Sequence, residues 1–148
     1  MTTAVYESVM QNIASRIQGL SLTDLTSDRV HVESVGTDEG KKLPFISVFL
    51  GDPERIPNGE GNNLQDRIHY SVFVAMVASK ESEATMRPKL LLWREQILDE
   101  FHLKTMPVTS IEYTESIPKA VMDRGAWFGK GLMISGLEIQ AHRLRARP

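Results

Sequence analysis

The stretch RIHYSVFVAMVA, residues 67–78, constrains the fold more than any other part of the chain. Its residues alternate between two sets, which a β-strand places on opposite faces of a sheet. One face receives Ile68, Tyr70, Val72, Val74 and Met76, and the other receives His69, Ser71, Phe73, Ala75 and Val77. Both sets are apolar from residue 72 onward, so the sequence predicts a central strand covered on both faces, by helices or by another subunit.

Apolar residues at helical spacing predict two helices. Between residues 3 and 19 they recur every three to four positions, and Thr2 or Thr3 is expected to cap the start of this helix. The second helix is expected within residues 79–103, with Pro88 in its first turn, where proline is tolerated. Its predicted buried stripe consists of Leu90, Leu91, Ile97, Leu98 and Phe101.

Four further strands are predicted around residues 29–35, 45–50, 108–113 and 132–144, the first at or near a sheet edge and the last with a bulge at Gly136. A chain of 148 residues is long enough to bury one core. The element order therefore predicts a single α+β domain covering residues 1–148. In it, two helices pack on one face of a mainly antiparallel, roughly five-stranded sheet.

Composition argues against several kinds of chemistry. The chain has no cysteine, which excludes disulfides, thiol catalysis and sulfur-ligated metals. Its formal net charge of −2 provides no general attraction to nucleic acid or to an anionic membrane. It has no run of eighteen apolar residues and no basic segment followed by an apolar one near its start, so we expect neither a membrane span nor a standard secretion signal.

Motifs for catalysis or cofactor binding fail on their context. GEGNNL, residues 59–64, begins like a dinucleotide fingerprint, but Leu64 replaces the third glycine and a strand follows. No nucleophile elbow occurs. His31, His69 and His142 would form a metal site only if their strands were neighbours. We therefore expect no catalysis, metal or cofactor, and a small metal- or nucleotide-binding domain or enzyme stands as the alternative.

Three segments are candidates for contact with other molecules. Residues 51–67, GDPERIPNGEGNNLQDR, form a loop too long and polar for a hairpin, and such loops are often functional. The candidate assembly residues in it are Arg55, Asn58, Gly59, Glu60, Asn62, Asn63, Asp66 and Arg67. The apolar end of the central strand and the segment RGAWFGKG supply a candidate subunit interface, formed by Val72, Val74, Val77, Trp127, Phe128 and Lys130.

The third candidate is the basic end of the chain, HRLRARP. Arg143, Arg145 and Arg147 alternate there, so an extended chain would turn all three to one side, toward DNA phosphates. A solvated terminal tail is the preferred alternative for these arginines. For Trp127 and Phe128, a plug at the end of the sheet is as well supported as a subunit contact.

The order of these segments resembles the tail terminator, or tail completion, proteins of long-tailed bacteriophages. The resemblance rests on an amphipathic first helix, DRVHVESV, LPFISVFLG, the long polar loop, RIHYSVFVAMVAS, KLLLWREQILDEF and GAWFGKGLMISGLEIQ. It implies a structural subunit that is assembled in the host cytoplasm and forms a hexameric ring at the tail-neck junction of a virion. Such a ring caps the tail tube, ends its polymerisation and provides the surface for head joining.

The partners implied by this resemblance are further copies of the chain, the tail-tube protein and a head-completion or connector protein. DNA would pass through the ring, and the loop at residues 51–66 would reach toward the tube or toward neighbouring subunits. No membrane partner is implied. A head-completion or connector protein of the neck is the alternative within the same class.

Overall fold

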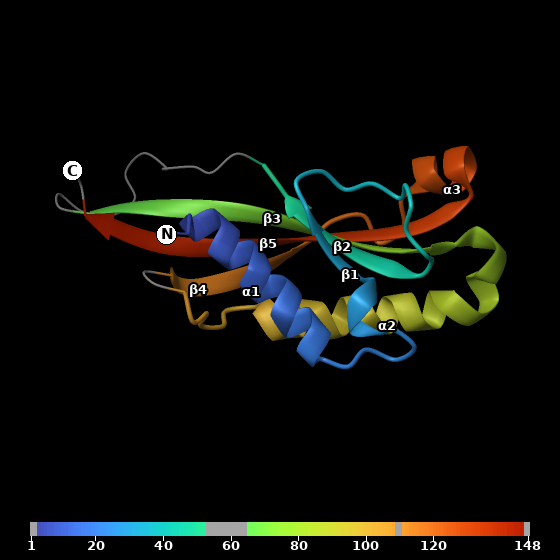
Figure 1. The fold of residues 1–148 in the computed structure, drawn as a ribbon, viewed down its shortest axis with the longest axis horizontal. Coiled ribbons are helices and arrows are strands. Elements are labelled where there is room, and N and C mark those ends of the chain that lie inside the picture. The colour runs from blue at the N-terminus through green and yellow to red at the C-terminus, as the bar shows by residue number, and fades with distance from the viewer. Residues whose placement is uncertain (1–2, 53–64, 109–110, 147–148) are drawn as a thin grey trace.

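Five strands form one sheet in the order β1-β2-β3-β5-β4, in a computed structural model that describes residues 3–52, 65–108 and 111–146 (Figure 1). Strands β1 and β2 are parallel, and the other three neighbouring pairs are antiparallel. The prediction of a mainly antiparallel sheet with residues 67–78 at its centre is confirmed. The strands are β1 (Val30–Glu33), β2 (Phe45–Leu50), β3 (Gln65–Ser79), β4 (Ile111–Pro118) and β5 (Leu132–Ala146).

Helices α1 (Val5–Gly19) and α2 (Glu83–Phe101) cover the same face of this sheet (Figure 1). Helix α1 packs on β1 and β2, whereas α2 packs on β3, β4 and β5. Shorter helices precede β1, α2 and β5, namely η1 (Ser27–Arg29), η2 (Lys80–Ser82) and α3 (Arg124–Lys130). The α+β prediction is confirmed. None of the helices in the described ranges combines the length and the apolar character needed to cross a membrane.

The alternation predicted for β3 places one set of side chains against the helices. Ile68, Tyr70, Val72, Val74 and Met76 are all buried there, in the main apolar cluster. The opposite face, which we call the open face, is covered by segments of the same chain. Near β2 this cover is the β1–β2 connection, residues 34–44. A Cβ atom on its Gly36 would lie 2.8 Å from the ring of Phe49.

The helix ends differ from the sequence prediction. Helix α1 begins at Val5, so its cap position is Ala4, which has no side chain to accept a hydrogen bond. Pro88 is not in the first turn, because α2 begins at Glu83 and makes Pro88 its sixth residue. The helix continues through this proline, since Met86 and Leu90 on either side of it are buried in the core.

Strand β4 lies later in the chain than predicted. The sequence stretch after Tyr113 is polar, yet Thr114 and Ser116 face α2 and are buried. Their hydroxyls donate to the carbonyl oxygens of Phe101 at 2.6 Å and Leu98 at 2.7 Å, in the last turn of α2. The end of a helix has unpaired carbonyl groups, so it satisfies these polar side chains inside the fold.

Two further predictions for the last third of the chain are wrong. Gly136 is no bulge, because it pairs with Ala75 in an unbroken register between β3 and β5. The register shift lies instead between β4 and β5, at Ile111 and Tyr113. The sequence also predicts no helix between the strands at residues 108–113 and 132–144, yet this segment contains α3, whose first turn is capped by the Asp123 carboxylate and which ends at Gly131 with φ of +66°.

Candidate assembly surfaces

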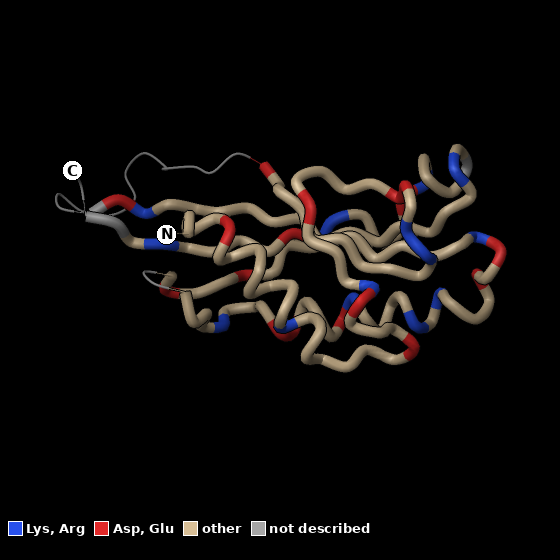
Figure 2. Tube along the Cα trace, viewed as in Figure 1, with Lys and Arg blue, Asp and Glu red and all other residues tan. Residues whose placement is uncertain are grey.

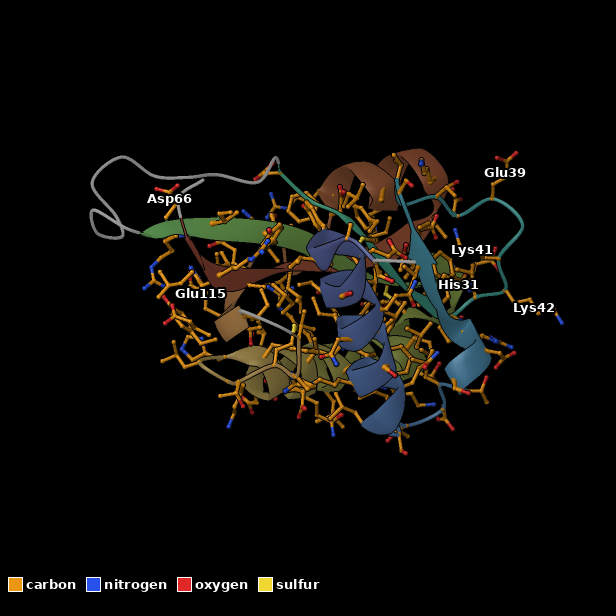
Figure 3. The ribbon with its side chains drawn as sticks, turned by 60° about the vertical axis from the view of Figure 1, so that its left-hand side comes forward. His31, Glu39, Lys41, Lys42, Asp66 and Glu115 are labelled. Carbon is orange, nitrogen blue, oxygen red and sulfur yellow. The ribbon has the colours of Figure 1, made fainter. Side chains whose placement is uncertain are left out.

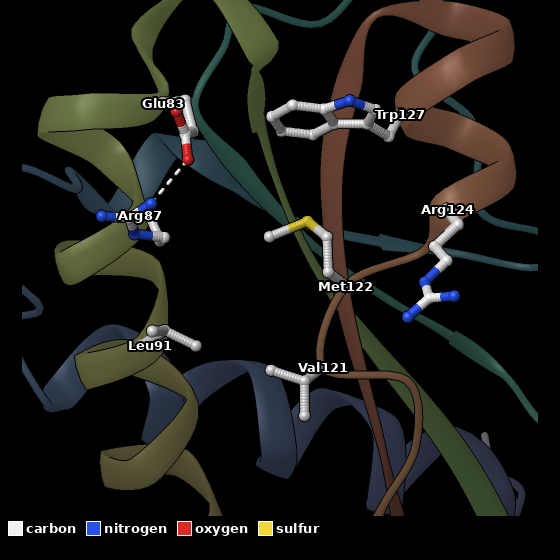
Figure 4. A pocket seen from close by; sticks show the side chains of 7 residues that line it. All are labelled: Glu83, Arg87, Leu91, Val121, Met122, Arg124 and Trp127. Atoms are coloured by element: carbon white, nitrogen blue, oxygen red, sulfur yellow. Dashed lines mark hydrogen bonds and ion pairs between the residues drawn. The ribbon is translucent and has the colours of Figure 1, made fainter.

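A groove of about 520 Å³ opens between α2 and the segment that joins β4 to β5 (Figure 4). Most of its surface is apolar, and its charged groups come from both walls. We call it the α2–α3 groove. It is lined by Glu83, Arg87, Leu91, Val121, Met122, Arg124 and Trp127.

The buried side chain of Arg94 fixes one wall of this groove in place. Its guanidinium donates to the carbonyl oxygens of Lys119 at 2.8 Å and Gly136 at 2.5 Å, and to Ser135 Oγ at 2.9 Å. Burial lowers the pKa of this guanidinium. Arg94 thereby ties the chain after β4 to α2 and β5. Sequence reasoning missed it, although an arginine in line with Leu90 and Ile97 was a visible signal.

Trp127 forms the upper part of the groove in Figure 4 and also packs against the main core. Lys80 Nζ lies 4.8 Å from the centre of its ring, a cation–π distance. Trp127 is half-buried, so one part of the ring packs in the fold and another part lines the groove. Its role in a subunit contact stays a prediction. Lys130 is exposed in the last turn of α3. The side chain of Phe128 lies outside the described part of the chain.

The charges around the groove are mostly positive. The lining residues of the groove include two cations, Arg87 and Arg124, against one carboxylate, Glu83. Glu83 is paired with Arg87 at 2.6 Å along the same helix face. An apolar surface with a surplus of cations suits a partner segment that carries apolar and acidic side chains.

The valines expected at a subunit interface lie inside the fold. Val72 and Val74 are buried beneath the two helices, and Val77 is buried on the open face with Phe45 and Leu132. The chain itself therefore covers these three valines, whereas Phe73 and Ala75 on the open face are only partly buried. We correct the predicted interface accordingly, because the three valines present no surface to a partner.

The predicted assembly loop is described only at its end. Arg55, Asn58, Gly59, Glu60, Asn62 and Asn63 lie outside the described residues, whereas Asp66 and Arg67 belong to β3. Arg67 Nη1 lies 2.7 Å from Glu112 Oε1, and its guanidinium lies 5.9 Å from the centre of the Tyr113 ring. Arg67 thus contacts β4 of its own chain, and its role in assembly stays a prediction.

A buried carboxylate occupies the open face of the sheet. Glu138 is 3% exposed and accepts hydrogen bonds from Ser71 Oγ at 2.5 Å and Gln140 Nε2 at 3.2 Å. Lys119 Nζ lies 3.2 Å away. Burial raises the pKa of this carboxyl, but the hydrogen bonds and the Lys119 charge outweigh it and the pKa falls below its usual value. Glu138 is thus held as an ionised, paired group, a role that the sequence analysis missed.

Two of the three strand histidines meet beside this cluster. The ring centres of His69 and His142 lie 4.3 Å apart, and Tyr113 stacks on His142 at 4.4 Å. His142 Nε2 lies 3.1 Å from Glu115 Oε1. His31 lies elsewhere, against Phe45. Within the described ranges no group of three or more histidine, aspartate or glutamate side chains is arranged to hold a metal ion.

Among the three arginines predicted to face DNA, only the first has a described side chain. Arg143 is half-buried, and its guanidinium donates to the hydroxyl of Tyr70 at 3.0 Å. The backbone of Arg145 continues β5, but its side chain and all of Arg147 lie outside the described part. A DNA-facing role for this tail therefore stays a prediction.

Comparison with known proteins gives a likeness of fold. No protein-family model matches the chain, and no curated protein matches it. The chain is similar to one chain of a solved structure described as "Virion of native gene transfer agent (GTA) particle", with a TM-score of 0.64 and 11% sequence identity. The likeness covers 97% of this chain and 100% of that chain, so the two share a fold over almost their whole length.

Proposed function

We propose that this chain is a structural protein of a phage-like virion and acts as a tail terminator. In this role it forms a ring that caps the tail tube and ends its polymerisation. The resemblance to tail terminator proteins implies six subunits in this ring. The same ring offers the surface for head joining. The observation that carries the proposal is the fold shared, end to end, with a chain of the gene transfer agent virion.

The proposed mechanism is binding without bond chemistry. A ring requires a head-to-tail contact, in which two different surfaces of each subunit meet. The α2–α3 groove is one suitable surface, because it exposes apolar side chains with Trp127 among them. Aromatic side chains supply much of the binding energy at protein interfaces.

The opposite end of the long strands is the proposed contact with the tail tube. Strand β2 pairs with β3 only at residues 72–77, so the earlier part of β3 extends beyond it together with β5 (Figure 1). The predicted assembly loop joins β2 to this end of β3. Strand β4 flanks β5 over most of this extension. A loop joined to this end of the sheet is well placed to reach a neighbouring protein.

The charge of the chain supports passage of DNA through the ring. A net charge of −2 provides little general attraction to a polyanion, and a conduit functions best when it does not hold its cargo.

The direct test is tail length in particles assembled without this protein. Overlong or uncapped tubes support the proposal. Tubes of normal length that fail to join heads favour the alternative neck role, a head-completion or connector protein. A metal or nucleotide retained by the purified protein in native mass spectrometry favours a ligand-binding domain or enzyme.

A further inference from the structure

We propose that the α2–α3 groove of one subunit receives the β1–β2 connection of the adjacent subunit, a second copy of this chain. In this contact Val35 packs against Val121 and its apolar neighbours, and Asp38 and Glu39 lie against the groove's cations. The inference rests on the proposed function, since it describes the contact that would close the ring.

The two surfaces lie at opposite edges of the sheet. Strand β1 is one edge strand, and the β1–β2 connection leaves from it. Strand β4 is the other edge strand, and the wall of the groove at residues 119–124 follows it. Figure 4 looks into the groove with β1 and β2 behind it. A head-to-tail ring needs two different patches on each subunit, and two surfaces at opposite sheet edges meet this need.

Both surfaces expose apolar side chains. Val35 is 74% exposed, the highest value among the large apolar side chains of the described residues. Val121 in the groove is 52% exposed. Burial of these two side chains against each other would remove apolar surface from water at both edges, which favours association.

The charges of the two surfaces are complementary. Asp38 and Glu39 are both exposed, and Figure 3 shows Glu39 pointing outward from the connection. Lys41 forms an ion pair with Glu33 of the same chain at 2.6 Å. Lys42 is the cation of the connection that points outward (Figure 3). Among the residues that line the groove, Arg87 is paired with Glu83, and the exposed Arg124 is the cation beyond that pair. Such a match favours the correct pairing of surfaces and speeds their encounter.

Cysteine cross-linking tests this contact directly, because the natural chain has no cysteine. Val35→Cys and Val121→Cys proteins are mixed with tail-tube protein and treated with a short bismaleimide. We expect cross-linked dimers in the mixture but not with either variant alone, and a ladder ending at the ring size with the double variant. Leu103→Cys replaces Val121→Cys in the control, because Leu103 is 65% exposed at the far end of α2.

Charge exchange provides a second, independent readout. Arg124→Glu alone, and Asp38→Lys with Glu39→Lys, should each weaken ring formation at least tenfold. Combining all three substitutions should restore most of the loss, since the opposed charges are exchanged. All of these side chains are exposed, so folding is retained, which circular dichroism checks.

The outcomes separate this inference from the function on which it rests. If wild-type rings cap tubes, and the cysteine variants also form rings but give no cross-link between positions 35 and 121 and show no rescue by charge exchange, the contact is overturned and the terminator function stands. A small ligand or a segment of another protein found in the groove of the assembled ring also overturns the contact. A wild-type protein that forms no ring on tubes, and whose loss leaves tail length normal, overturns the function itself.

Discussion

The two faces of the sheet are closed in different ways. On the helix face, α1 and α2 bury an almost wholly apolar layer that includes Val72 and Val74. On the open face, short connections cover the sheet and polar groups such as Glu138 and His142 are buried in pairs and stacks. Repeated apolar spacing in the sequence therefore encodes the cover of the helix face, whereas the cover of the open face depends on partners from distant segments.

Charged residues lie mostly at the surface, and the buried ones have partners. Figure 2 places most lysine, arginine, aspartate and glutamate residues on helices, turns and strand ends. Glu138 is an exception in the middle of β5, where Lys119 and Ser71 pair with it. A buried carboxylate is stable only with such partners.

The largest expected effect comes from removing the largest side chain on the helix face. Trp93 is fully buried, and its Nε1 donates to the carbonyl oxygen of Thr23 at 3.0 Å. Trp93→Ala should lower the free energy of unfolding by about 3–5 kcal/mol, measured by urea denaturation. Leu92→Ala, at the adjacent exposed position, is the control and should change it by less than about 0.5 kcal/mol. Equal losses in the two variants would contradict the assigned orientation of α2.

A smaller loss of unfolding free energy is expected from replacing Arg94, the buried charged residue on the helix face. Arg94→Met keeps most of the side-chain volume but leaves the carbonyl oxygens of Lys119 and Gly136 without their buried donor. The loss should be about 2–3 kcal/mol. Amide hydrogen exchange should rise at residues 119–123 before it rises in β3, because Arg94 holds that segment. Unchanged exchange there would show that the backbone pairing with β5 is sufficient by itself.

The histidine pair of the open face should produce a pH-dependent effect. Burial first, and then the neighbouring His69, lower the pKa of His142, while Glu115 opposes the shift. The unfolded chain therefore binds more protons, so His142 contributes stability above about pH 6.5, which is lost as the pH falls toward its folded pKa. Each unit of lowering corresponds to about 1.4 kcal/mol.

The check is the slope of unfolding free energy against pH below 6.5. His142→Phe should flatten this slope, since the variant has no proton to take up at that position. His102→Gln alters an exposed histidine and should keep the wild-type slope. A wild-type slope in His142→Phe would mean that another group causes the acid sensitivity.

The smallest effect is expected at the surface pair between β3 and β4. Glu112→Gln removes the partner of Arg67, and both side chains are partly exposed. Such pairs contribute about 0.2–1 kcal/mol, so the change in unfolding free energy should fall in that range and shrink in high salt. A loss above this range would mean that the stacking of Arg67 on Tyr113 depends on the pair.

The elements that could be predicted from the sequence are those whose apolar residues recur at the spacing of one helix face or one strand face. The span of β2 and the alternation and central place of β3 follow from such repeats, as does the first helix apart from its cap. The rest required tertiary partners. Ser116 is buried only because Leu98 supplies a carbonyl oxygen, and α2 continues through Pro88 only because its neighbours are packed in the core.

The candidate surfaces were predictable only in part. Trp127 between glycines was a visible signal, and it does line the groove. The other wall comes from α2, and Val121 reaches the groove through a segment held by Arg94, so no local pattern could reveal it. Val72 and Val74 show the opposite error, because an apolar strand does not tell whether a helix or a partner subunit covers it.

The most direct test of the proposed ring is the mass of the purified protein in solution, alone and mixed with tail-tube protein, by light scattering coupled to size exclusion. We expect a closed ring, either free or formed when monomers meet the tube. A monomer that stays a monomer and does not associate with the tube would contradict it.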